Sequence, residues 1–456
     1  MFQPMRARCI TSVVFAITGL IALGSPAAAA DSSDRRSDPD DVRFLVRSPD
    51  PAAIQQIEQL FKSRDYRNTL LLLKLETVPQ AVWLTGGTPG EVTDVVDRTL
   101  RMADLQHAVP VFVAYNIPGR DCGSYSAGGA QTTPDYEAWV NAIAVTIAER
   151  RAIVILEPDA IPLLPSDCGH DPTGQLTTDR YAQLNYAVGA LAALPRTRVY
   201  LDAGNSHWQA VGTIASRLVK AGLAQARGFS LNVSNGQPTA AQVKYGTWVG
   251  ECISFANDSS QGGSHLGHYN DCASQYNPAD GNDYSTWALT DAWYANHLSA
   301  PPTNPPHFVI DTSRNGQMHA TNATVDATYG TEPPGRMTIY ALPPYNQPAT
   351  TVSTLAGGSW CNAPGAGVGV RPTADTGNSL VDAFLWIKTA GESDGTCDSA
   401  GGARAWDYSV YSKPGWPTTS AAQEVFDPLW GLNDPAAGAW FPEQALQLAQ
   451  LALPPL

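Results

Sequence analysis

Short apolar runs separated by amphipathic segments constrain the fold of this chain more than any other feature of its sequence. Strands are expected at residues 109–115, 152–156, 198–201, 228–233, 307–310 and 381–387. Apolar residues recur with helical spacing at residues 134–150, 179–194, 206–222 and 440–451. Strands that are apolar on both faces are typical of parallel sheets covered by helices. The alternation predicts one parallel β/α barrel, with an open doubly wound sheet as the alternative architecture.

The composition narrows the range of partners. The formal net charge is −14 and only 15% of the residues are charged, which disfavours nucleic acid and anionic membranes because their binding needs clustered Lys and Arg. No early strand is followed by G-x-G-x-x-G, so a dinucleotide cofactor has no support. The 12 Trp and 17 Tyr either fill the core or line a groove for an uncharged ligand.

The N-terminal residues have the pattern of a secretory signal. Arg6 and Arg8 precede an apolar run from Ile10 to Leu23, and small residues follow at 28–30. The run is shorter than the roughly 20 residues that a membrane-spanning helix needs. We therefore expect a secreted protein that has no membrane association once the signal is removed. The expected organisation is a signal peptide at 1–30, a short polar leader at 31–41 and one folded domain at 42–456.

Six cysteines follow the signal, and an even number in a secreted chain predicts disulfide bonds. Six cysteines allow 15 pairings, among which the spacing alone does not choose. A zinc site is the alternative, and the absence of C-x-x-C together with the wide spacing disfavours it. The six are Cys122, Cys168, Cys252, Cys272, Cys361 and Cys397.

Carboxylate and amide side chains follow nearly every expected strand. In a β/α barrel the carboxyl ends of all strands meet at one face, where active sites lie. One or two such residues would be explained as helix N-caps. Their recurrence over six strands predicts instead a convergent acidic site. The residues concerned are Asn116 and Asp121, Glu157 and Asp159, Asp202 and Asn205, Asn232 to Asn235, Asp311, and Lys388 with Glu392 and Asp394.

Carboxylates that share one cleft repel each other, so one of them keeps a proton near neutral pH. That proton can be donated to a glycosidic oxygen while a second carboxylate polarises a water molecule. A divalent metal site is the competing interpretation, but no D-x-D-x-D loop or H-E-x-x-H occurs. A serine hydrolase is disfavoured because the G-x-S-x-G match at Gly391 to Gly395 leads into a long segment and not into the helix that a nucleophile elbow requires. We therefore expect neither a metal nor a cofactor, and we expect His207, His265 and His268 to be polar loop residues.

Six motifs, in this order along the chain, give a specific resemblance. From about Val42 to its end, the chain resembles glycoside hydrolase family 6, the cellobiohydrolases and endoglucanases that act on β-1,4-glucan. The motifs are Tyr115 to Cys122 (YNIPGRDC), Ile155 to Asp159 (ILEPD), Tyr200 to Gly204 (YLDAG), Ile310 to Gly316 (IDTSRNG), Trp360 to Asn362 (WCN) with Gly369 to Pro372 (GVRP), and Trp386 to Lys388 (WIK) with Gly391 to Gly395 (GESDG).

The resemblance implies a distorted, seven-stranded, TIM-like parallel barrel with long active-site loops, and inversion at the anomeric carbon. Matched motif by motif, Asp159 corresponds to the general acid. Asp121 looks like the partner that raises the pKa of the acid and helps to organise the water. Asp394 matches the residue proposed as the base, a role that a chain of water molecules can also fill.

The resemblance further implies a set of residues that contact the glucan chain. Tyr115 looks like the ring that favours a distorted sugar, and Asp202 looks like a supporting carboxylate. Asn205 stands where relatives often have His, and Val211 stands where fungal cellobiohydrolases have a second Trp. The remaining expected contacts are Trp83, Arg120, Trp208, Asn235, Trp360, Lys388 and Glu392.

The family's two disulfide bonds correspond to Cys122–Cys168 and Cys361–Cys397, which leaves Cys252 to pair with Cys272. Three long segments, at residues 236–306, 317–359 and 395–439, do not follow the strand and helix pattern. In this family such loops roof the site of exo-acting members, so the resemblance favours a monomeric exo-enzyme that releases cellobiose from a β-1,4-glucan chain.

Two alternatives and three possible glycosylation sites stay open at this stage. The alternative mode of action is an open-cleft endoglucanase. A secreted carbohydrate-binding protein without activity is a further alternative, which the presence of Asp121, Asp159 and Asp394 disfavours. Of the N-x-S/T sites at Asn232, Asn257 and Asn322, we expect Asn232 to be buried and unmodified.

Overall fold

The computed structural model describes residues 42–456 apart from 125, 318–319, 322–323, 326–336, 359 and 398–404. Residues 42–456 form one compact unit. The predicted signal and leader at 1–41 lie outside the described residues, as does the sequon at Asn322. In the described part of the chain, no helix is long and apolar enough to cross a membrane.

Seven parallel strands form the central sheet, and their order in space follows their order in the chain. A doubly wound sheet reverses its strand order at a switch point, so that alternative architecture is wrong. The backbone N–H of Ala81, beside β1, donates to the carbonyl of Trp386, just after β9, at 3.0 Å. The predicted curled, barrel-like sheet is confirmed. The strands are β1 (Val82–Leu84), β2 (Val111–Ala114), β3 (Ala152–Leu156), β4 (Thr197–Asp202), β5 (Gly228–Leu231), β6 (His307–Asp311) and β9 (Val381–Leu385).

The strands are apolar on both faces because each face packs against a different core. On β2, Val111 and Val113 point inward and pack with Ile155 and Val309 in the barrel interior. Phe112, which alternates with them, points outward and belongs to the core beneath the surrounding helices. This double burial explains why the strands read as short continuous apolar runs rather than as alternating ones.

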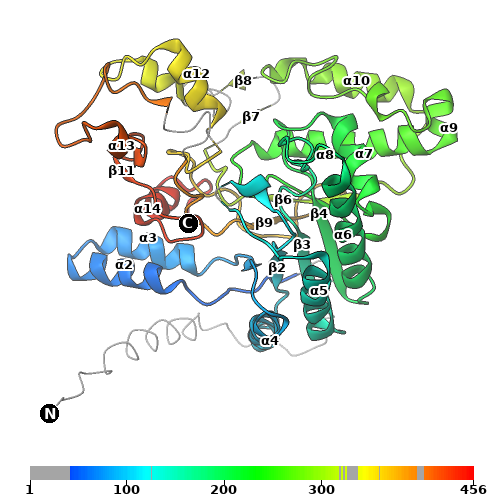
Figure 1. Cartoon of the computed structure of the whole chain (residues 1–456), viewed down its shortest axis with the longest axis horizontal. Helices are drawn as coiled ribbons and strands as arrows, with labels where there is room; N and C mark the ends of the chain where they lie inside the picture. Colours follow the sequence, from blue (N-terminus) through cyan, green and yellow to red (C-terminus); the bar gives the residue numbers. More distant parts are fainter. Residues whose placement is uncertain are drawn as a thin grey trace, which may run out of the picture. The chain divides into compact units, whose positions relative to one another are not determined.

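Helices surround the sheet, with α5 and α6 on one side and α2, α3 and α14 on another (Figure 1). The first of these sides packs on the outer face of the strands, and α2, α3 and α14 share a separate apolar cluster. The longer helices are α2 (Pro51–Lys62), α3 (Tyr66–Glu76), α4 (Pro89–Gln106), α5 (Thr133–Ile147), α6 (Gln175–Ala192), α7 (Val211–Lys220), α8 (Thr239–Asn257), α10 (Ala288–His297), α12 (Ala349–Gly357) and α14 (Pro442–Gln450).

The four predicted helices are present, and one of them begins later than expected. The helix expected from residue 206 begins at Val211, because the preceding residues form a turn. In that turn, the side chain of Asn205 accepts the N–H of His207 at 2.9 Å, and its carbonyl accepts the N–H of Trp208 at 3.1 Å. Asparagine favours such turns because its side chain competes for nearby backbone groups.

The segment at 236–306 is more ordered than a long loop, because it contains α8 and α10. Helix α8 buries Tyr245, Trp248 and Phe255, so its apolar face is part of the core rather than an insertion. The Gly, Asn and Ser residues that follow α8 hid this pattern in the sequence. Asn232, just after β5, is fully buried as expected, whereas Asn257 at the end of α8 is exposed.

Candidate active site

A cavity of about 970 Å³ opens at the carboxyl ends of the strands. Residues from the ends of β2, β3, β4, β5 and β9 line it, as the barrel geometry predicts. Among the predicted catalytic and glucan-contacting residues, Asp202 does not line the cavity, and its side chain is 1% exposed. The strand-end residues Asn116, Glu157, Asn232 and Asp311 are also buried outside the wall. The predicted residues in the wall are Trp83, Tyr115, Arg120, Asp121, Asp159, Asn205, Trp208, Asn235, Trp360, Lys388, Glu392 and Asp394.

Asp159 stands three residues beyond β3 with a left-handed backbone, φ 67°. Its backbone N–H donates to the carboxylate of Asp202 at 3.0 Å, and the same oxygen accepts the N–H of Gly204 at 3.2 Å. Burial and the charges of Asp202, Asp121 and Asp394 raise the pKa of Asp159 well above its ordinary value. The protonated form of Asp159 is therefore favoured over the ionised form.

Asp121 begins a 3₁₀ turn, Asp121–Gly123, also with a left-handed backbone. Its carboxylate accepts the backbone N–H of Ser126 at 2.8 Å. Burial raises the pKa of Asp121, although this N–H and the charge of Arg120 act in the opposite direction. Asp121 is thus a second carboxyl group of raised pKa beside Asp159.

Arg120 shapes the wall beside these carboxyl groups. Its guanidinium donates to the backbone carbonyls of Thr85 at 2.6 Å and Ser126 at 2.7 Å, and it lies 4.6 Å from the centre of the Tyr115 ring. The Tyr115 ring meets the edge of Trp83 with centroids 5.5 Å apart. Arg120 therefore stabilises the cavity wall through contacts with backbone carbonyls and with the Tyr115 ring. The rings of Tyr115 and Trp83 pack against each other at one end of this part of the wall.

Asp394 has the opposite surroundings to Asp159. One carboxylate oxygen lies 2.5 Å from the guanidinium of Arg314, and the other lies 3.2 Å from the ammonium of Lys388. Burial raises the pKa of Asp394, but the two cations outweigh it and hold the pKa below its ordinary value. Asp394 is therefore ionised at neutral pH, and it lines the same cavity as Asp159, a carboxyl group of raised pKa.

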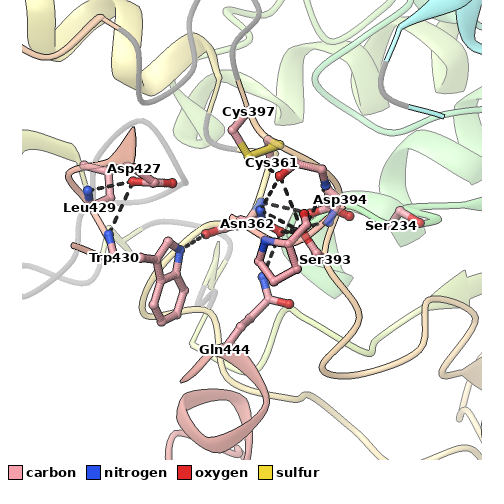
Figure 2. The surroundings of a disulfide bond; sticks show 12 residues. Ser234, Cys361, Asn362, Ser393, Asp394, Cys397, Asp427, Leu429, Trp430 and Gln444 are labelled. Carbon is pink, nitrogen blue, oxygen red and sulfur yellow. Dashed lines mark hydrogen bonds between the residues drawn. A yellow bond between two sulfur atoms is a disulfide. The ribbon is translucent and has the colours of Figure 1, made fainter. Parts of the chain in front are cut away.

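Asn362 fixes the backbone around Asp394, as Figure 2 shows. Its N–H donates to the Asp394 carboxylate at 2.9 Å, and its side-chain carbonyl accepts the Asp394 N–H at 2.8 Å. The indole N–H of Trp430 donates to the Asn362 carbonyl at 2.6 Å, and Gln444 donates to its side chain at 3.2 Å. Asp394 is consequently held on both its backbone and its side chain.

Comparison with known proteins places the chain in a family. The sequence profile described as Glycosyl hydrolases family 6 matches residues 40–452. The chain belongs to this family. The predicted resemblance is confirmed, and the protein is a glycoside hydrolase.

Relatives of this family 6 hydrolase include both named types of enzyme. Endoglucanase A of Thermobispora bispora is 30% identical over 420 residues, covering 90% of this chain and 68% of the relative. The 1,4-beta-D-glucan cellobiohydrolase C of Emericella nidulans is 29% identical over 406 residues, covering 83% and 70%. Sequence similarity therefore does not favour one mode of action over the other.

The fold is shared with solved structures of the family. An endoglucanase of Mycobacterium tuberculosis, bound to methyl-cellobiosyl-4-deoxy-4-thio-beta-D-cellobioside, is 29% identical, with a TM-score of 0.56 over 90% of this chain and 97% of that one. The catalytic core of a cellobiohydrolase of Chaetomium thermophilum is 24% identical, with a TM-score of 0.57 over 91% and 98%. The second likeness supports the fold alone.

Disulfide bonds of this family 6 hydrolase brace the loops that carry its carboxyl groups. The bond between Cys122 and Cys168 starts beside Asp121, and the bond between Cys361 and Cys397 encloses the Asn362–Asp394 contact. The third bond joins Cys252 of α8 to Cys272. The pairing is the one that the resemblance implied.

One group of potential metal-ligating side chains lies close together in the described part of the chain: Cys397, Asp427 and Asp434. The sulfur of Cys397 is bonded to Cys361, so it offers no thiolate to a metal ion. In Figure 2 the Asp427 carboxylate instead accepts the backbone N–H groups of Leu429 and Trp430, at 2.7 and 3.3 Å.

Sequence reasoning assigned no role to Asn362, although it stands inside a motif quoted for the family. It counted Glu157 among the carboxylates of the cavity, whereas the structure places Glu157 outside the cavity wall. Gln237 had no signal, yet it lines the cavity, and its side-chain carbonyl is buried without a hydrogen-bond donor in the described structure. Asp311, a strand-end aspartate, proves structural, because it accepts the N–H of Lys388 at 2.9 Å and so joins β6 to the residues after β9.

Proposed function

We propose that this family 6 hydrolase is a secreted cellulase that cleaves β-1,4-glucosidic bonds with inversion of the anomeric carbon. The observation that carries the proposal is the opposite surroundings of two carboxyl groups in one cavity. Burial and three neighbouring carboxylates raise the pKa of Asp159, whereas Arg314 and Lys388 contact Asp394 and lower its pKa. An acid and an ionised carboxylate that face one cavity match the requirements of glycoside hydrolysis.

In the proposed reaction, Asp159 donates its proton to the glycosidic oxygen as the bond to the anomeric carbon breaks. A water molecule attacks that carbon from the opposite face and loses a proton, so the products are two shorter sugars and an ionised Asp159. We assign Asp394 as the acceptor of that proton. We assign to Asp121 the role of orienting an intervening water molecule through which the proton reaches Asp394.

The substrate proposed is a β-1,4-glucan chain such as cellulose, held without a metal or cofactor. Tyr115 and Trp83 offer aromatic faces for a sugar ring near Asp159, and Trp208 and Trp360 offer further rings in the same cavity. Polar groups that the family resemblance assigns to glucose units surround them. These are Arg120, Asn205, Asn235, Lys388 and Glu392, with Asp202 in support outside the wall.

Exo action that releases cellobiose is the proposed mode, with an open-cleft endoglucanase as the alternative. Ala356 and Gly357 of the segment 317–359, and Ala437 and Gly438 of the segment 395–439, line the cavity together with Trp360 and the strand ends. Loops that contribute wall residues from outside the barrel are what an enclosed site requires. The proposed secreted monomer would consist of the catalytic domain 42–456 after loss of the signal 1–30, and its three disulfide bonds fit an oxidising location.

The test is hydrolysis of cellohexaose by the mature chain, with product anomers followed by NMR. We expect α-cellobiose as the first dominant product, and we expect Asp159→Asn to lower kcat by roughly 10²- to 10⁴-fold, the contribution typical of a general acid. Asp382→Asn is the matched control, because it removes the same charge from a partly buried aspartate of β9 that does not line the cavity.

Each alternative outcome has a distinct meaning. A β-anomer as the first product would overturn inversion, and a spread of product sizes would favour the endoglucanase. Binding of cellohexaose without hydrolysis would favour the carbohydrate-binding alternative.

A further inference from the structure

Two loops carry the acid and its partner: the β2 loop, residues 116–121, and the β3 loop, residues 157–160. Glu157, the first residue of the β3 loop, is fully buried. Its carboxylate accepts the backbone N–H of Asn116 and that of Ile117, each at 3.0 Å. One side chain of the β3 loop therefore holds the start of the β2 loop.

Arg180 of α6 also contacts both loops. Its guanidinium donates to the carbonyls of Pro118 at 3.0 Å and Gly119 at 3.2 Å, both in the β2 loop. It also donates to the carbonyl of Ala160 in the β3 loop at 3.2 Å. Arg180 is 3% exposed, so these backbone groups take the place of water around a buried cation.

The loops need such restraint because their backbones are strained. Asp121, Glu157 and Asp159 all have left-handed φ angles, of 53°, 49° and 67°. A non-glycine residue in a sparsely populated region costs of order 1 kcal/mol or more, and it persists only when its surroundings over-determine it. The five bonds made by Glu157 and Arg180 meet that requirement for both loops.

We propose that Glu157 and Arg180 are positioning residues that set the placement of Asp121 relative to Asp159. Neither side chain lines the cavity, so both act through the loops and not on the substrate. This inference rests on the proposed function, since it takes Asp159 as the acid.

A consequence for the acid follows from the geometry. Part of the raised pKa of Asp159 comes from burial and from the nearby charge of Asp121. If the loops loosen, Asp121 moves away and water approaches Asp159, and both changes lower the pKa of the acid. The value of kcat then decreases, and the enzyme loses activity at a lower pH than before. Sugar binding is retained, because the residues of the cavity wall are unchanged.

The experiment compares Glu157→Gln and Arg180→Lys with Asp382→Asn, each in the full mature chain. The control is matched because the carboxylate of Asp382, like that of Glu157, accepts more than one hydrogen bond outside the cavity wall, here from Arg227 at 2.7 Å and from Tyr200 at 2.6 Å. Arg180→Lys keeps the charge but not the fork that reaches three carbonyls, so it serves if Glu157→Gln does not fold. The measurements are kcat and KM on cellohexaose, the pH profile of kcat, and Tm.

We expect both loop variants to lower kcat by roughly 10- to 100-fold, the effect of misplacing a reacting group by about 1 Å, with KM changed less than about threefold. We also expect the basic limb of their pH profiles to move to lower pH. The control is expected to lower Tm and to leave kcat and the limb unchanged. Loop variants that behave like the control would overturn the inference. A wild-type chain that hydrolyses no cello-oligosaccharide would overturn the proposed function and this inference with it.

Discussion

Buried carboxyl groups lie on both sides of the cavity, and their pKa values are shifted in opposite directions on the two sides. On the side of β2 to β4, Asp121, Asp159 and Asp202 lie together, and burial raises the pKa of each. On the side of β6 and β9, Asp394 lies between Arg314 and Lys388, and its pKa is lowered. The difference teaches that the placement of cations, rather than the choice of aspartate, decides which group is an acid and which is an anion.

The largest effect that would test this contrast is the pH dependence of stability. Burial raises the pKa of Glu157 and of Asp202 to about 7, from ordinary values of 4.5 and 3.8. Between the ordinary pKa values and about pH 7, the folded state binds more protons than the unfolded state. The free energy of unfolding therefore falls as the pH rises through this range. With about 1.4 kcal/mol for each tenfold difference in acid dissociation, we expect the free energy of unfolding to drop by several kcal/mol between about pH 5 and pH 7.

Urea unfolding at the two pH values measures this drop. Glu157→Gln removes one of the two titrating groups, so its free energy of unfolding should change less between the same pH values. A wild-type chain that is more stable at pH 7 than at pH 5 would contradict the assignment of the acidic side.

The next effect concerns the cationic side. Lys388 and Lys62 each lie 3.2 Å from a carboxylate, but the Lys388–Asp394 side chains are 10% and 8% exposed and the Lys62–Glu58 side chains are 73% and 32% exposed. Lys388→Met should cost about 2–4 kcal/mol, because it takes one of two cations from a buried anion. Lys62→Met should cost less than about 1 kcal/mol.

Urea unfolding of the two methionine variants at pH 7 gives both numbers. Equal losses would show that Asp394 does not depend on Lys388, and that Arg314 alone holds it ionised.

The smallest expected effect concerns the contribution of Asp202 to the raised pKa of Asp159 on the acidic side of the cavity. Asp202→Asn removes one of the charges that raise the pKa of Asp159, so the acid should lose its proton at a lower pH. We expect the basic limb of the kcat profile for cellohexaose to move down by about one pH unit. An unmoved limb, or one that moves to higher pH, would show that Asp202 only positions the backbone of Asp159.

Much of the fold was predictable because parallel strands buried on both faces read as plain apolar runs. The strand-end rule then gathered the cavity residues, because the carboxyl ends of parallel strands share one face. The rule does not separate Asp159, which enters the cavity, from Asp311, which binds backbone N–H groups, because both follow a buried strand. Strand β1 was missed, since its three residues are too few to show a pattern.

The supporting residues were less predictable than the carboxyl groups themselves. Arg180 is one polar residue within a helix, and only the folded structure shows that its guanidinium reaches Pro118 and Gly119, some sixty positions away. The ionised state of Asp394 likewise depends on Arg314, which lies 80 positions from it in the chain. Contacts at such separations leave no local pattern, whereas Asn362 and Glu157 could be noticed because they stand within recognisable motifs.

The placement of the disulfide bonds has a practical consequence for producing the enzyme. Two of the three cross-links start beside Asp121 and Asn362, in the loops that hold the carboxyl groups, while apolar packing builds the barrel. In a reducing recombinant host such as bacterial cytosol, the barrel would fold while these loops lack their disulfide bonds. Soluble yield would then overstate the fraction of competent enzyme, and titration of free thiols would be the better measure of product quality.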